Sequence, residues 1–307
     1  MVRVRDREPG TVNREPIAAL HPRKCFSVPL PDGRALDLGE RTLVMGILNV
    51  TPDSFAEPGP RTDPARAAED ALRMEEDGVD IVDVGGESTR PGAEPVSASE
   101  ELARVVPVLR RLRGRLRVPL SIDTYKAEVA EAALAEGAVI VNDISGLRYD
   151  SAVGRVAAAR RAALVLMHTR GRSRAMYREA VYVALVSEVV AELRESLEAA
   201  VAAGVPRERI VLDPGLGFAK HAGHSFELLA QLPGLTALDR PLLVGPSRKS
   251  FLKAALGDVP PGARDFGTAA AVAAAVLGGA HIVRVHAVRE MCEVVRVADE
   301  IRKRAGR

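Results

Sequence analysis

Five polar residues in this sequence have side chains suited to binding a multiply charged anion. Asn49, Thr89, Arg90, Arg284 and His286 offer hydrogen-bond donors, two guanidinium groups and an imidazole, which suit a phosphate or diphosphate. A single arginine is equally typical of a surface ion pair. In a strand, however, Arg284 and His286 point the same way because they are two residues apart. Asn49 also offers an amide oxygen to Mg²⁺, which uses few protein ligands together with phosphate oxygens.

A second group of side chains alternates hydrogen-bond acceptors with donors. It consists of Asp123, Asn142, Asp213 and Lys249. Such a group matches the edge of a flat heterocycle with amino, ring-nitrogen and carbonyl groups, as in the guanidine-like edge of a pterin. Two other interpretations stay open for each aspartate, which can act as a general base or cap a helix.

Several other kinds of site find no support in the sequence. It contains no thiol–histidine pair and no Gly-x-Ser-x-Gly motif, and the segment 245–249 lacks the Walker A spacing. His221 and His224 have the spacing of a metal pair, but no further His or Cys lies nearby, so we expect solvated loop residues. Cys25 and Cys292 are the only cysteines, which predicts no disulfide framework and fits a reducing cytoplasm.

The composition is that of a globular protein with a large core. The 307 residues are 47% hydrophobic and 27% charged, with a net charge of +2, no Trp and 3% aromatic residues. This balance predicts no nucleic-acid partner. The N-terminal segment lacks the apolar run of a signal peptide, and the longest apolar run, 269–280, is too short to span a bilayer. We therefore expect a soluble, cytoplasmic protein without a membrane partner.

Short apolar runs alternate with helical patterns along the chain. The runs are 43–48, 79–84, 119–122, 138–141, 164–167, 210–212, 242–244 and 282–285. The helical patterns are 65–77, 100–113, 126–136, 153–161, 181–203, 225–231, 248–256 with 267–277, and 288–304. Eight such repeats predict a single (β/α)8 TIM barrel over residues 36–307. Residues 1–35, punctuated by five prolines, are expected to form a short irregular leader.

Nearly every predicted strand ends in a run of polar residues and glycine. Helix capping explains a few of them, such as Asp63 or Ser151, but not the whole pattern. In a barrel the carboxyl ends of the strands converge on one face, where active sites are built. The pattern therefore predicts an enzyme.

Seven segments, taken in order, resemble the dihydropteroate synthases. They are 45–55 (MGILNVTPDSF), 83–93 (DVGGESTRPGA), 121–124 (SIDT), 141–143 (VND), 212–218 (LDPGLGF), 246–250 (PSRKS) and 284–286 (RVH). The similarity runs from about residue 42 to the C-terminus. It implies a transferase that joins 4-aminobenzoate to 6-hydroxymethyl-7,8-dihydropterin diphosphate, with Mg²⁺, as a homodimer.

The resemblance also implies a role for each matching residue. Asn49 would contact the metal, and Arg90, Arg284 and His286 the diphosphate. Asp123, Asn142, Asp213 and Lys249 would hold the pterin between Met167 and Arg284, beside Gly217. Phe55, Thr89, Pro91, Phe218 and Ser247 would form the aminobenzoate pocket. Asp123, Lys249, Arg284 and His286 would serve catalysis by stabilising the departing diphosphate and the methylene cation.

Three residues depart from the family pattern. Ala56 begins a loop segment that differs from the usual one, Ala219 replaces a usual glycine, and Ala287 replaces a usual aspartate after His286. We expect a stiffer loop at Ala219 and an imidazole without an orienting carboxylate at His286.

Two other functions remain to be compared. A methyltetrahydrofolate–corrinoid methyltransferase would share the pterin contacts but would not need the segments 88–92 and 247–250. A non-catalytic paralogue would not need Asn49, Arg90, Lys249 and His286 intact.

The residues of the stretch 268–280 are small and apolar on nearly all sides of the predicted helix, which predicts a dimer interface.

Overall fold

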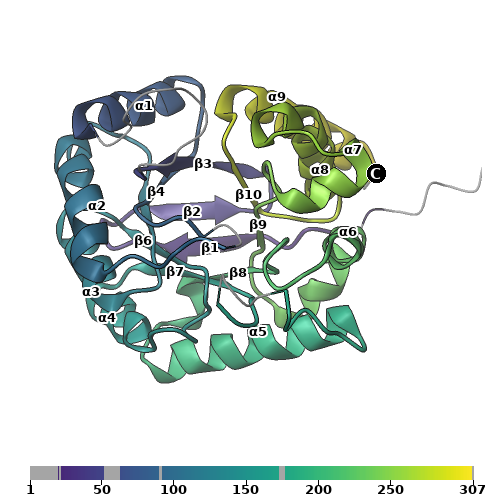
Figure 1. Cartoon of the computed structure of the whole chain (residues 1–307), viewed down its shortest axis with the longest axis horizontal. Helices are drawn as coiled ribbons and strands as arrows, with labels where there is room; N and C mark the ends of the chain where they lie inside the picture. Colours follow the sequence, from purple (N-terminus) through teal and green to yellow (C-terminus); the bar gives the residue numbers. More distant parts are fainter. Residues whose placement is uncertain (1–19, 21, 52–62, 90–91, 173–176, 306–307) are drawn as a thin grey trace, which may run out of the picture.

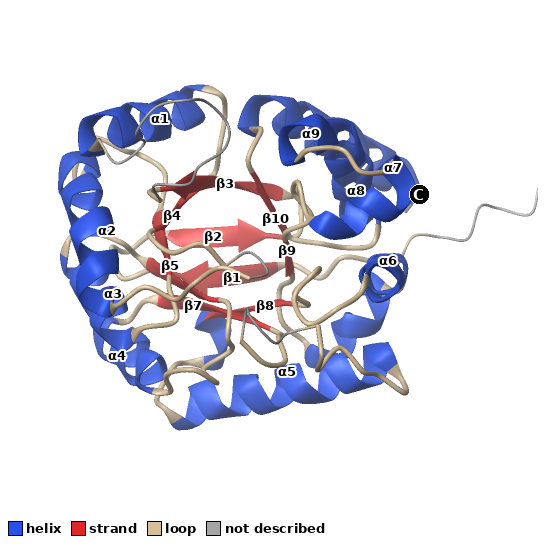
Figure 2. Ribbon diagram, in the orientation of Figure 1, coloured by secondary structure: helices blue, strands red, loops and turns tan. Residues whose placement is uncertain are grey.

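Eight parallel strands form the centre of the molecule, and helices surround them (Figures 1 and 2). The computed structural model describes residues 20, 22–51, 63–89, 92–172 and 177–305. The strand order is β8-β7-β6-β5-β4-β3-β10-β9, and a parallel bridge between Leu212 and Leu242 joins the two ends. The strands are β3 (Leu43–Asn49), β4 (Ile81–Gly85), β5 (Leu120–Asp123), β6 (Ile140–Asp143), β7 (Ala163–Met167), β8 (Ile210–Asp213), β9 (Leu243–Val244) and β10 (Ile282–Val285). The predicted (β/α)8 barrel is confirmed.

The helices follow the strands in the expected alternation. They are α1 (Pro64–Glu76), α2 (Ala98–Leu112), α3 (Ala127–Ala135), α4 (Ala152–Arg160), α5 (Leu185–Ala202), α6 (Ala222–Ala230), α7 (Lys253–Leu256), α8 (Asp265–Leu277) and α9 (Val288–Ala305). Asp63 caps α1 by accepting from Ala65 N, with Pro64 in the first turn. None of the described helices is long and apolar enough to cross a membrane.

Two helices begin several residues later than their sequence patterns predict. The pattern over 248–256 forms a 3-10 turn at Ser250–Leu252 and becomes the helix α7 only at Lys253. The apolar periodicity favoured a helix from residue 181, whereas α5 starts at Leu185. The carboxylate of Glu188 accepts from the backbone N–H groups of Val183 and Ala184, both at 2.7 Å. These two bonds satisfy donors at the helix start, so residues 181–184 remain outside the helix.

A hairpin closes the amino-terminal end of the barrel. Strands β1 (Phe26–Pro29) and β2 (Ala35–Leu38) pair antiparallel. Val28 and Leu38 are buried in one cluster with residues from the starts of the barrel strands, such as Met45 and Ile282. The leader expected over residues 1–35 therefore differs from the structure at residues 26–29, which form a strand packed on the barrel. A second, larger cluster fills the space between the strands and the helices.

Candidate active site

A cavity of about 440 Å³ lies at the carboxyl ends of the barrel strands. Every barrel strand, or the loop that follows it, contributes to its lining. Of the residues predicted for the site, the cavity is lined by Asn49, Thr89, Asp123, Asn142, Met167, Asp213, Gly217, Phe218, Ser247, Lys249, Arg284 and His286. Phe55, Arg90 and Pro91 lie outside the described residues, as does Ala56. Among the described residues, the structure thus brings the heterocycle-binding set and the anion-binding residues Asn49, Thr89, Arg284 and His286 into one space.

Arg284 is held by two carboxylates at the floor of this cavity. Its Nε donates to Asp83 Oδ2 and its Nη2 to Asp123 Oδ2, both at 2.6 Å. Asn142 Nδ2 donates to the same Asp83 oxygen at 2.9 Å. Burial raises the pKa of Asp123 to about 7, although the Arg284 charge opposes the rise. Two anions and one cation therefore share a site that is largely closed to water.

Sequence reasoning did not single out Asp83. Its side chain is 0% exposed, and its Oδ1 has no hydrogen-bond partner among the described residues. The available signal was a carboxylate in the middle of the apolar strand β4, two residues before Gly85, where its side chain shares the inner face of the barrel. A buried carboxylate in such a strand requires a cation, and Arg284 is that cation.

Asp213 and Lys249 supply an acceptor and a donor on the opposite wall. Asp213 Oδ1 accepts from Gly215 N at 2.7 Å, and Lys249 Nζ donates to Leu216 O at 2.5 Å. The Lys249 ammonium also lies 4.4 Å from the centroid of the Phe218 ring. Burial raises the pKa of Asp213 and lowers that of Lys249 to about 8, and in each case the partner's charge opposes the shift.

A serine contacts the imidazole of His286 and orients it. Ser247 Oγ lies 2.9 Å from His286 Nδ1 and accepts from His286 N at 3.2 Å. The backbone N–H uses the hydroxyl as an acceptor, so the hydroxyl proton is available to Nδ1. This favours the tautomer protonated at Nε2, which can donate to an anion. Ser247 thus orients the ring although Ala287 occupies the position of the family's usual aspartate.

The loop after β8 depends on backbone angles that favour glycine. Gly215 and Gly217 have φ angles of +69° and +78°. A Cβ atom at Gly215 would lie 2.0 Å from the carbonyl oxygen of His168, so only glycine fits there. Ala219 adopts φ +48° and is fully buried. The alanine therefore occupies the left-handed conformation for which the family's usual glycine is better suited.

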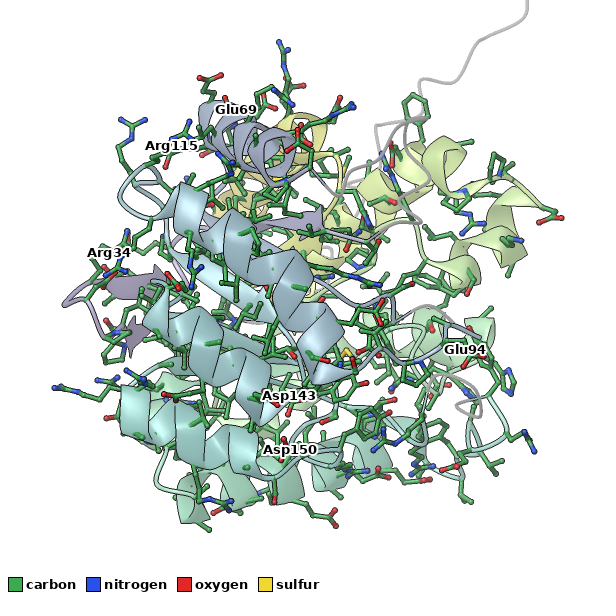
Figure 3. The ribbon with its side chains drawn as sticks, turned by 60° about the vertical axis from the view of Figure 1, so that its left-hand side comes forward. Arg34, Glu69, Glu94, Arg115, Asp143 and Asp150 are labelled. Carbon is green, nitrogen blue, oxygen red and sulfur yellow. The ribbon has the colours of Figure 1, made fainter. Side chains whose placement is uncertain are left out.

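Two aspartates in or near the loop after β6, Asp143 and Asp150, act in the supporting structure. Asp143 accepts from Ser145 N and Leu147 N, both at 2.7 Å, and so holds the turn after β6. Asp150 accepts from the backbone at the start of α3 and of α4. Figure 3 labels both aspartates. Neither lines the cavity, so these two are structural residues.

Glu87 lines the cavity but was not predicted. It forms an ion pair with Lys126, which also pairs with the buried Glu101, and it accepts from Tyr125 Oη at 2.8 Å. Its place in the segment GGEST was a signal that sequence reasoning left unused. The cluster anchors the loop that carries Thr89.

His221 and His224 lie in an aromatic group rather than at a metal. The His221 ring stacks on Tyr177 with 5.8 Å between centroids, and His224 contacts Tyr182 edge to face at 5.1 Å. His221 is exposed and His224 half-buried, at the start of α6 rather than in an extended loop. Within the described ranges, no group of three or more His, Cys, Asp or Glu residues is arranged to hold a metal.

Comparison with known proteins agrees with this geometry. Residues 45–286 match the family described as "Pterin binding enzyme". A dihydropteroate synthase from Synechocystis sp. is 47% identical over 277 residues, covering 90% of this chain and 96% of that protein. The crystal structure of the Yersinia pestis dihydropteroate synthase with a sulfonamide drug complex is 41% identical, with a TM-score of 0.86 over 91% of this chain and 100% of that chain. The Xanthomonas albilineans enzyme with 4-aminobenzoic acid is 40% identical, with a TM-score of 0.81 over 89% and 98%.

Proposed function

The chain belongs to the pterin-binding enzymes and, among them, to the dihydropteroate synthases, and we propose that its cavity joins 4-aminobenzoate to 6-hydroxymethyl-7,8-dihydropterin diphosphate. The products are 7,8-dihydropteroate and pyrophosphate, a step of folate biosynthesis. One observation carries the assignment. The heterocycle-binding side chains and the described anion-binding side chains line the same cavity, with Arg284 between the two carboxylates Asp83 and Asp123.

The pterin ring is assigned to the wall formed by Asp213, Lys249 and Asn142. The Asp213 carboxylate accepts from the guanidine-like edge of the ring, because a carboxylate can accept two parallel N–H bonds. Lys249 donates to ring acceptors from the same side. Met167, at the end of β7, provides an apolar surface for one face of the ring.

The reaction breaks the bond between the pterin methylene carbon and the diphosphate oxygen. The bonding electrons leave with pyrophosphate, and the positive charge is shared between the methylene and the conjugated ring. Asp123 stabilises that cation, while Arg284 and His286 stabilise the departing anion. Two of the five N–H groups of Arg284 are used by Asp83 and Asp123, which leaves others for the diphosphate. The amine of 4-aminobenzoate then bonds to the methylene carbon, and the nitrogen passes its extra proton to solvent or to the released pyrophosphate. No strong base is needed, because the amine attacks a cation.

Mg²⁺ is the metal that suits this donor set. Asn49 lines the cavity at the end of β3, and its amide oxygen is a hard ligand. The absence of a three-residue ligand cluster from the described part of the chain fits a metal that binds mainly through diphosphate oxygens. When bound, it would neutralise charge on the leaving group. Chelation is then expected to abolish turnover while the melting temperature of the ligand-free enzyme is unchanged.

The second substrate is assigned to the part of the cavity lined by Thr89, Phe218 and Ser247. The predicted partners Phe55 and Pro91 lie outside the described residues. The similarity to an enzyme solved with 4-aminobenzoic acid supports this placement.

A homodimer is part of the proposal. Phe266 of α8 is 93% exposed, and Ala270 and Ala274 follow it at four-residue spacing on the same exposed face. Val297 and Ile301 of the neighbouring helix α9 are 63% and 52% exposed. A continuous apolar face of this kind favours an interface between copies of the chain. Sedimentation that shows only a monomer at micromolar concentration would contradict it.

We place the enzyme in the cytoplasm, which two cysteines without a disulfide framework support.

Pyrophosphate release from the pterin diphosphate tests the activity. We expect release that depends on 4-aminobenzoate, with dihydropteroate formed in equal amount. A Lys249→Met variant is the matched control and should release little. A corrinoid methyltransferase or a non-catalytic paralogue would release no pyrophosphate, with or without 4-aminobenzoate. That outcome would refute the proposal.

A further inference from the structure

The side chain of Lys220 is fully buried directly behind the cavity wall. Burial lowers the pKa of its amine well below the usual range, although the Asp213 charge opposes the shift. The residue is 1% exposed and follows Phe218 by two positions in the loop after β8. Its Nζ lies 2.8 Å from His168 Nδ1, 2.9 Å from Phe218 O and 3.4 Å from His168 O. Three acceptors match the three protons of an ammonium group.

The hydrogen bonds continue from Lys220 to helix α5. His168 Nδ1 accepts from the ammonium, so the ring proton is on Nε2, which donates to Glu192 Oε2 at 3.2 Å. Burial lowers the pKa of His168 to about 4, with the Lys220 charge acting in the same direction, so the imidazole is neutral. Arg148 and Arg170 also donate to the Glu192 carboxylate, at 3.0 and 2.9 Å. The Glu192 carboxylate, at the end of this series of hydrogen bonds, is therefore firmly held.

Of the two carbonyl groups that Lys220 contacts, one belongs to a residue of the cavity lining and the other to the neighbour of a lining residue. Phe218 lines the cavity itself, and His168 directly follows Met167, which lines it as well. A second tie acts on the same loop, because Tyr182 Oη donates to Ala219 O at 3.0 Å. Lys220 thus joins the loops after β7 and β8 at the point where their side chains meet the cavity.

We propose that Lys220 is a positioning residue, which fixes the Phe218 ring and thereby sets the affinity for the arylamine substrate. The proposal rests on the proposed function, because it assumes that Phe218 faces 4-aminobenzoate. A buried ammonium is costly, and an apolar side chain of similar length would fill the space at less expense in desolvation. The chain instead has a lysine here, whose hydrogen bonds reach Phe218 of the cavity lining and His168 beside it.

A Lys220→Met variant tests the role, since methionine keeps the length and removes all three donors. We expect the KM for 4-aminobenzoate to rise about tenfold, the effect of losing roughly one well-placed hydrogen bond. The kcat at saturation and the KM for the pterin diphosphate should change less. In ¹⁵N NMR, His168 should become protonated at a higher pH than in the parent, because the neighbouring charge is gone.

Arg23→Met is the matched control. Arg23 is also a buried basic residue, with a side chain 2% exposed and paired with Asp299, but it lies at the hairpin end of the barrel. The Arg23→Met substitution should lower the melting temperature and leave the KM values for 4-aminobenzoate and the pterin diphosphate unchanged. If Lys220→Met behaves in the same way, with only stability lost, the positioning role is refuted.

Glu192→Gln decides the matter if Lys220→Met does not fold. Glu192 lies on the outer helix α5 with 18% of its side chain exposed, so its substitution is milder. The KM for 4-aminobenzoate should rise in this variant as well, and an unchanged value would overturn the proposal. Inactivity of the parent enzyme would instead refute the proposed function, which keeps the two failures distinct.

Discussion

Arg284 and Asp83 form a buried ion pair beneath the substrate cavity, with 2.6 Å between Nε and Oδ2. The Asp83 side chain is 0% exposed, whereas the second partner of Arg284, Asp123, is 11% exposed. Arg284 thus has a hidden anchor and a partner that faces the substrate. The hidden pair orients the guanidinium before any ligand arrives, which reduces the reorganisation required during the reaction.

Replacing the hidden anchor should be costly. We expect Asp83→Asn to lower the free energy of unfolding by about 3 kcal/mol, because it leaves a buried charge without its partner. The same change at Asp123 should cost less stability, since that side chain is nearer to water, although both variants should lose activity. Urea denaturation compares the two, and an equal loss of stability would show that Asp83 is no more of an anchor than Asp123.

Asp213→Asn should weaken pterin binding far more than it alters folding. Loss of the negative charge should cost about 1.5–3 kcal/mol for each hydrogen bond that the carboxylate makes to the ring. Titration calorimetry with the pterin substrate and a thermal melt separate the two effects. A variant that binds as tightly as the parent while melting much earlier would make Asp213 a structural residue.

The catalytic efficiency kcat/KM for the pterin diphosphate should have a bell-shaped pH dependence. It should rise as the Asp123 carboxyl, with its pKa raised to about 7, loses its proton. It should fall as the Lys249 ammonium, with its pKa lowered to about 8, loses its own. The residual activity of Asp123→Asn should lack the acidic limb, and that of Lys249→Met should lack the alkaline limb. Limbs that persist in both variants would belong to the diphosphate of the substrate, whose titration all variants share.

4-Aminobenzoate should bind appreciably only when pyrophosphate with Mg²⁺, or the pterin diphosphate, is already present. Arg90, assigned to the anion, stands in sequence between Thr89 and Pro91, which are assigned to the aminobenzoate pocket. An anion that clamps Arg90 would therefore fix its neighbours, and a ligand as small as 4-aminobenzoate cannot meet that ordering cost alone. Arg90→Ala should then weaken aminobenzoate binding. Micromolar binding to the free enzyme in calorimetry would contradict this coupling.

Much of this architecture could be predicted because it depends on local patterns. Apolar runs that end in polar residues predicted the positions of all eight strands. Twelve of the predicted site residues line one cavity. The roles of those residues, and of Phe55, Arg90 and Pro91, stay predictions. Asp83 and Lys220 were not anticipated, because their partners Arg284 and His168 are distant in sequence. The late start of α5 depends on hydrogen bonds from two backbone N–H groups to the Glu188 carboxylate. The spacing of apolar residues in the sequence does not reveal such bonds.

The β1–β2 hairpin packs on one end of the barrel, where Val28 and Leu38 join the cluster at the strand starts, and the described cavity lies at the other end. We expect a ligand to enter from the cavity end. A molecule resting on Asp213 and Asp123 at the floor would be covered by one held at the rim beside Phe218. The pterin compound would then enter before the arylamine, and dihydropteroate, which fills both places, would compete with both substrates. Product-inhibition kinetics would thus reveal the order in which the substrates bind. That order would follow from the position of the β1–β2 hairpin at the opposite end of the barrel.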